Sequence, residues 1–122
     1  MNSISHIPKA EIHVHLEATI TPSLCRKFAK RNKVILSDDF FGSEYAYQWE
    51  DFYDFLKKYD IVTSVIHTPE DYYELTYAYL KECASHNVLY VEAMVSSTHA
   101  KAKGMTYQSF LDSIQEASLN AE

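Results

Sequence analysis

The sequence contains very little glycine: Gly42 and Gly104 are the only two among 122 residues. Phosphate-binding loops and dinucleotide fingerprints need several closely spaced glycines, because the backbone must turn tightly and approach the phosphate. Neither pattern can be written anywhere in this chain. The scarcity of glycine therefore excludes both of these nucleotide-binding classes.

Cysteine is equally scarce. Cys25 and Cys83 lie far apart and form neither a C-x-x-C pair nor a disulfide framework, which favours free thiols in a reducing compartment. Residues 1–9 lack the apolar core of a signal peptide. No window approaches the roughly 18 consecutive apolar residues of a membrane span. We therefore expect a cytoplasmic protein.

Positive charge is in deficit, with 11 Lys and Arg against 17 Asp and Glu and a net charge of −6. Nucleic acids and anionic membranes attract basic surfaces, so neither is expected as a partner. The apolar fraction of 47% and the charged fraction of 23% are typical of a folded globular protein.

Periodic apolar patterning is abundant. Residues 10–16 alternate between apolar and polar side chains, which predicts a strand, and the apolar run 88–95 predicts a buried strand. Helices are expected over 22–32, 49–65, 69–86 and from 106 onward, with irregular segments over 33–48 and 96–104. The broad apolar face expected on the second helix comprises Trp49, Phe52, Tyr53, Leu56, Tyr59 and Ile66. Strands separated by helices predict parallel pairing.

Three polar residues on the first strand suggest chemistry. His13, His15 and Glu17 follow one another at a period of two, which predicts that they project from one face, with Glu17 just past the strand's end. Two imidazoles held by a strand can ligate one Zn²⁺. On spacing alone, an exposed polar strand face is the more common explanation of a lone H-x-H pair.

Residues 8–17, P-K-A-E-I-H-V-H-L-E, resemble the first-strand signature of the adenosine deaminase family, P-K-x-E-L-H-x-H-L-[DE]-G. Ile12 replaces the leucine of that signature, and Ala18 stands where the family has glycine. The sequence F-L-K-K-Y is similar to the family helix F-L-x-x-[FY] that covers the purine pocket. The segment 88–92 is similar to the second-strand pattern G-V-x-Y-x-E. The resemblance is colinear over nearly the whole chain.

The resemblance implies an α/β fold. Residues 1–122 would form the N-terminal, truncated part of a (β/α)₈ barrel, with about two strands and their surrounding helices. The implied reaction is hydrolytic deamination of a 6-aminopurine nucleoside or base, with release of ammonia and with zinc as the cofactor that activates water. By match, the zinc ligands are His13 and His15, the substrate contact is Glu17, and the apolar wall over the substrate is Phe55, Leu56 and Tyr59.

No position of this chain matches the family's third histidine ligand or its catalytic acid, which lie on later strands. His67, His86 and His99 are expected to be ordinary surface histidines, so we predict no catalytic residue here. Three interpretations stay open: an inactive segment of such an enzyme, half of a split enzyme completed by a second chain, or a non-catalytic remnant that binds or self-associates. Adenosine, adenine and modified adenine nucleotides stay open as substrates.

Overall fold

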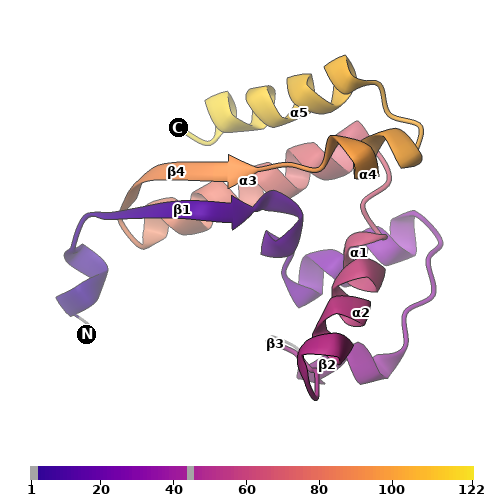
Figure 1. The fold of residues 1–122 in the computed structure, drawn as a ribbon. Helices are drawn as coiled ribbons and strands as arrows, with labels where there is room; N and C mark the ends of the chain where they lie inside the picture. The colour runs from indigo at the N-terminus through magenta and orange to yellow at the C-terminus, as the bar shows by residue number, and fades with distance from the viewer. Residues whose placement is uncertain (1–2, 44–45) are drawn as a thin grey trace. The chain divides into compact units, whose positions relative to one another are not determined.

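The computed structural model describes residues 3–43 and 46–122, which divide into two compact units. The first unit combines the N-terminal residues up to Thr19 with residues 68–122. The second unit comprises the described residues between Ile20 and His67. Figure 1 labels the helices and strands of both units.

The first unit contains a two-stranded parallel sheet of β1 (Lys9–His15) and β4 (Val88–Met94). The two arrows lie side by side and point the same way in Figure 1. Short 3₁₀ turns, Ser3–His6 and Leu16–Thr19, precede and follow β1. The predicted parallel pairing is thus confirmed.

Helix α3 (Pro69–Ser85) begins as the sequence predicts. The Thr68 hydroxyl accepts a hydrogen bond from the Asp71 backbone N–H, and the Asp71 carboxylate accepts one from the Thr68 backbone N–H, each at 3.1 Å. This reciprocal cap satisfies two N–H groups that the first helical turn leaves without partners. The helix packs on α5 (Tyr107–Asn120), where the rings of Tyr72 and Phe110 meet edge to face at 4.7 Å.

Two predictions for the first unit are wrong. Most of β4 is exposed rather than buried, with Leu89 at 72% and Tyr90 at 54%. The reason is that no further strand pairs with β1 or β4 among the described residues. The segment 96–104 is not a simple loop, because it contains α4 (Ser97–Ala102), whose N-cap Ser96 accepts a hydrogen bond from the His99 N–H at 3.1 Å.

The second unit contains α1 (Pro22–Arg31) and α2 (Phe52–Thr63), capped by Thr21 and Asp51. The predicted irregular segment 33–48 instead holds a 3₁₀ turn, Asp38–Phe40, and an antiparallel pair, β2 (Phe41–Ser43) and β3 (Ala46–Tyr47). Residues 44–45 of that segment lie outside the described residues. Within the described residues of both units, no helix is both long enough and apolar enough to cross a membrane.

The apolar face predicted for α2 is largely exposed, which corrects that prediction. Trp49, Phe52, Tyr53 and Leu56 are 50%, 68%, 78% and 42% exposed, whereas Ile66 is fully buried. The buried apolar side chains of this unit are Ile20, Cys25, Phe28, Ala29, Val62, Val65 and Ile66. Burial therefore falls at the end of α2 and just beyond it, while the aromatic residues at its start contact one another.

Candidate functional site

The histidine pair predicted as zinc ligands lies together on β1. The ring centroids of His13 and His15 are 5.5 Å apart, with the ring planes inclined at 65°. Both residues are exposed, so the imidazole nitrogens are accessible from outside the unit. The strand thus presents two zinc-type ligands near its carboxyl end, where (β/α)₈ enzymes place their active-site groups.

A backbone irregularity accompanies the pair. His13 has φ of +59°, and the register against β4 shifts between Glu11 and Val14. The simple alternation predicted for residues 10–16 is therefore wrong at this point. Glu11 lies on the α3 side of β1, where its Oε2 accepts a hydrogen bond from the Tyr79 hydroxyl at 3.2 Å, while Ile12 is 67% exposed. A bulge separates Glu11 from the histidines because it adds one residue to the strand.

Glu17 lies in the 3₁₀ turn that follows β1, so the strand's period of two does not extend to it. Its side chain is buried, with only 3% of the residue exposed. Its Oε2 accepts two hydrogen bonds, from the Tyr72 hydroxyl at 2.9 Å and from the Ser96 backbone N–H at 2.9 Å. The carboxylate therefore links the end of β1 to α3 and to the end of β4.

Ala18, which replaces the glycine of the family signature, lies inside the same 3₁₀ turn. Its φ is not positive, since the positive-φ residues other than glycine are His13, Lys33 and Asn87. An L-residue adopts this conformation without strain. The alanine is thus compatible with the turn that buries Glu17.

The described residues contain only half of a typical zinc ligand set. Within residues 3–43 and 46–122, no three His, Cys, Asp or Glu side chains are grouped so that they could hold a metal ion. His86 is exposed at the end of α3, with its Nε2 3.9 Å from a Glu82 carboxylate oxygen, as a surface histidine should be. His67 and His99 are half-buried, so the surface prediction holds only in part for them.

The predicted substrate wall lies on α2, in the second unit. The ring of Phe55 is 6.2 Å from that of Tyr59, and Leu56 is 42% exposed. Trp49 at 5.1 Å and Phe52 at 6.3 Å from Phe55 extend the same aromatic cluster. The sequence pattern placed Trp49 and Phe52 on a shared apolar face, and spacing alone did not predict that they are 50% and 68% exposed.

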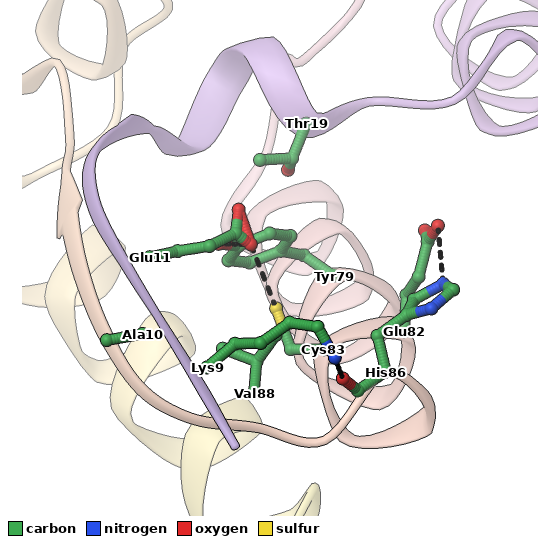
Figure 2. Close-up of a pocket in the computed structure, with 9 residues that line it drawn as sticks. All are labelled: Lys9, Ala10, Glu11, Thr19, Tyr79, Glu82, Cys83, His86 and Val88. Atoms are coloured by element: carbon green, nitrogen blue, oxygen red, sulfur yellow. Dashed lines mark hydrogen bonds and ion pairs between the residues drawn. The ribbon is translucent and has the colours of Figure 1, made fainter. Parts of the chain in front are cut away.

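A pocket of about 530 Å³, lined by both charged and apolar side chains, opens elsewhere in the first unit (Figure 2). Its lining includes Glu11, whose Oε2 accepts weakly from the Cys83 thiol at 3.8 Å, and Lys9, whose Nζ donates to the His86 carbonyl at 2.7 Å. Lys9 and Val88 are the first residues of the paired strands. The pocket thus lies at the amino ends of the two strands, whereas the histidine pair lies toward the carboxyl end of β1.

Neither cysteine has the character of a nucleophile. Burial raises the pKa of the Cys25 thiol to about 11, and burial also raises the pKa of the Cys83 thiol. Both cysteines are buried and free of disulfides. A buried neutral thiol reacts slowly, because the thiolate is the reactive form.

Sequence reasoning missed Tyr72 and Ser96, which hold Glu17. Tyr72 sits on the apolar face of α3, where its spacing predicts only a core residue. Tyr72 is 55 residues from Glu17 in the sequence, and Ser96 is 79 residues from it. No local pattern signals such pairings.

Comparison with known proteins identifies close likenesses. The adenosine deaminase family model matches residues 8–122. An adenine deaminase from Rhizobium leguminosarum is 40% identical over 111 residues, which cover 91% of this chain and 34% of that protein. The chain thus spans about a third of the length of the curated relatives it matches.

Solved structures give the same result. The crystal structure of an adenine deaminase from Arthrobacter aurescens superimposes with a TM-score of 0.75 at 26% identity, over 94% of this chain and 36% of that one. An amidohydrolase from Burkholderia ambifaria, determined with bound Zn, has a TM-score of 0.76 at 19% identity, over 97% of this chain and 33% of that one. The α/β fold is that of part of a (β/α)₈ barrel.

Proposed function

Because the chain belongs to the adenosine deaminase family, we propose that it supplies the first zinc-binding strand of a purine deaminase. The reaction is hydrolytic removal of a 6-amino group, with release of ammonia. The observation that carries this proposal is the adjacent pair His13 and His15 at the carboxyl end of β1. The domain is then a deaminase domain of which residues 1–122 form the N-terminal segment.

Adenine is the substrate that we favour over adenosine. The curated relatives with 33–40% identity are described as adenine deaminases, as is the Arthrobacter aurescens structure. The aromatic cluster of Trp49, Phe52, Phe55 and Tyr59, of which Trp49 and Phe52 are exposed, supports a purine-sized planar ligand, since aromatic rings stack well on such a ligand.

The donor set fits half of a zinc centre. His13 and His15 would hold the metal, since neutral imidazoles are common zinc ligands and a strand fixes their spacing. When bound, zinc supplies a Lewis acid that makes water a nucleophile near neutral pH. Glu17 accepts a hydrogen bond from the substrate.

In this proposal the 122-residue chain is inactive by itself. The completed enzyme acts in the cytoplasm. Catalytic zinc sites use three protein ligands plus water, and the described residues group only two. A proton-donating acid is also required for the amino group to leave. A longer chain or a complementing chain would supply both.

A chimeric enzyme tests the proposed function. This chain replaces the matching third of the Rhizobium leguminosarum adenine deaminase, and ammonia release from adenine is measured. We expect adenine turnover, because the chain supplies equivalent ligands in an equivalent strand. A folded, zinc-loaded chimera that fails to turn over adenine or adenosine would contradict the deaminase assignment.

Matched variants locate the metal site in the same chimera. His13→Ala and His15→Ala should each lower zinc affinity and ammonia release by at least the roughly 10–100-fold that loss of an outer-shell partner costs, because each removes a direct ligand. His86→Ala, which removes an exposed histidine at the end of α3, should change neither. Equal zinc affinity in all three variants would show that the histidine pair is not the metal site.

A further inference from the structure

The burial of Glu17 sets a requirement on its surroundings. A carboxylate with 3% exposure loses most of its hydration, so its oxygens need hydrogen-bond donors. Two donors meet on a single oxygen: the Tyr72 hydroxyl and the Ser96 backbone N–H both lie 2.9 Å from Oε2. Oε1 accepts neither of these bonds.

Two donors on one oxygen fix how the carboxylate is oriented. With a single donor, the carboxylate could rotate and exchange its two oxygens. The Ser96 N–H comes from rigid backbone, because Ser96 caps α4 through its own side chain. The Tyr72 ring is equally restrained, since it is fully buried and packs edge to face on Phe110 at 4.7 Å.

We propose that Tyr72 is a positioning residue for Glu17: its hydroxyl, together with the Ser96 N–H, holds Oε2 and leaves Oε1 as the oxygen that accepts a hydrogen bond from the substrate. The proposal rests on the function proposed above, in which Glu17 contacts the purine. Tyr72 touches no substrate itself. It acts by holding the Glu17 carboxylate in place before the substrate binds. Less conformational entropy is then lost on binding, which raises the affinity for the substrate.

The chain offers a matched control on the same helix. Tyr79 also donates its hydroxyl to a carboxylate, but that carboxylate is Glu11, at 3.2 Å, beside the pocket at the amino end of β1. Tyr72→Phe and Tyr79→Phe therefore remove equivalent groups. Only the first should disturb the end of the strand that carries the histidines.

Amide hydrogen exchange of Ser96 in the full 122-residue chain is the first test. Tyr72→Phe should speed exchange of this amide about tenfold beyond any change shared by the other α3 and α5 amides, because its acceptor is no longer held. Tyr79→Phe should change it less than about twofold. Glu17→Gln should keep Ser96 protected within about threefold, because the amide oxygen can take the place of Oε2. Equal rates at Ser96 in the two tyrosine variants would overturn the proposal.

A measurement on the unaltered chain covers the case in which Tyr72→Phe does not fold. The hydrogen–deuterium isotope shift on the Tyr72 ring carbon that bears the hydroxyl reports how slowly that hydroxyl exchanges. A resolved, slowly exchanging hydroxyl is expected, in contrast to the exposed Tyr53 and Tyr107. Exchange as fast as in those two residues would refute the hydrogen bond on which the proposal depends.

Kinetics in the chimera separate positioning from general stability. Tyr72→Phe should raise the KM for adenine about tenfold while kcat changes less than threefold, and Tyr79→Phe should leave both within twofold. An unchanged KM in Tyr72→Phe would overturn the positioning role. A chimera that deaminates nothing would instead refute the proposed function, and the Ser96 exchange rates would still decide whether Tyr72 orients Glu17.

Discussion

The left-handed backbone at His13 gives a prediction that can be worked out from the structure. His13 has φ of +59°, whereas His15 is not among the positive-φ residues. For an L-residue with a side chain, the left-handed conformation costs about 1–2 kcal/mol. Glycine adopts it almost freely, but glycine in a strand loses about 0.5–1 kcal/mol more conformational entropy on folding than alanine.

The difference in stability between the glycine and the alanine variant should therefore have opposite signs at the two histidine positions. His13→Gly should be more stable than His13→Ala by up to about 1.5 kcal/mol, since a strain of about 1–2 kcal/mol is relieved against an entropic cost of about 0.5–1 kcal/mol. His15→Gly should be less stable than His15→Ala by about 0.5–1 kcal/mol, because no strain is relieved there. Each comparison is between two variants that lack the imidazole, so the loss of the ring contact and of any bound metal cancels.

The assay must report on the first unit. Trp49 is the only tryptophan and lies in the second unit, so its fluorescence does not follow β1. Amide exchange of β1 and β4, measured with a chelator present, gives the free energy of opening for the paired strands. If glycine is less stable than alanine at both positions, the strand is not left-handed at His13 and the bulge assigned here is wrong.

Further predictions concern the cap, the core and the thiol. Thr68→Ala should destabilise α3 by about 1 kcal/mol in urea titrations, because it removes the side-chain acceptor of the capping box, and Thr68→Ser should restore most of that loss. Phe110→Ala should cost about 3–5 kcal/mol in the same titrations, since the ring is fully buried against Tyr72. The raised pKa of Cys25, about 11 against 9.0 for the free thiol, means that the folded state favours the neutral thiol. The buried neutral thiol therefore contributes to the free energy of unfolding below pH 9, and this contribution is lost as the pH rises toward 11. Over that range the free energy of unfolding of Cys25→Ala should fall less than that of the unaltered chain.

The helix ends were predictable from the sequence because local chemistry determines them. Thr68, Pro69 and Asp71 specify the start of α3 within four residues, and Thr106 does the same for α5. The parallel pairing was predictable from the order of elements. The short pair β2 and β3 was missed because two or three residues per strand give too short a run for a period to appear.

The neighbourhood of His13 and His15 was predictable from the sequence only in part. His13 and His15 share a face in the structure, but the alternating pattern placed Glu11 with them, and the bulge moves Glu11 to the α3 side. A period of two carries no information about an inserted residue. The exposed start of α2 shows the same limit, because an aromatic stripe at helical spacing does not distinguish a core face from a binding surface.

Two glutamates, one within β1 and one just past its end, attach the strand to α3. Glu11 binds the Tyr79 hydroxyl and Glu17 binds the Tyr72 hydroxyl, and both tyrosines belong to α3. These tyrosines are about two helical turns apart, a separation of about 10 Å along the helix axis. The strand is thus attached to one rigid helix before and after the bulge, so the strain at His13 cannot be relieved by sliding β1 along α3. Removing both attachments in Tyr72→Phe/Tyr79→Phe should free the strand to shift. The ring resonances of His13 and His15 should then broaden in NMR spectra. A sharp, unchanged histidine pair in that double variant would show that the pairing with β4 alone fixes the strand.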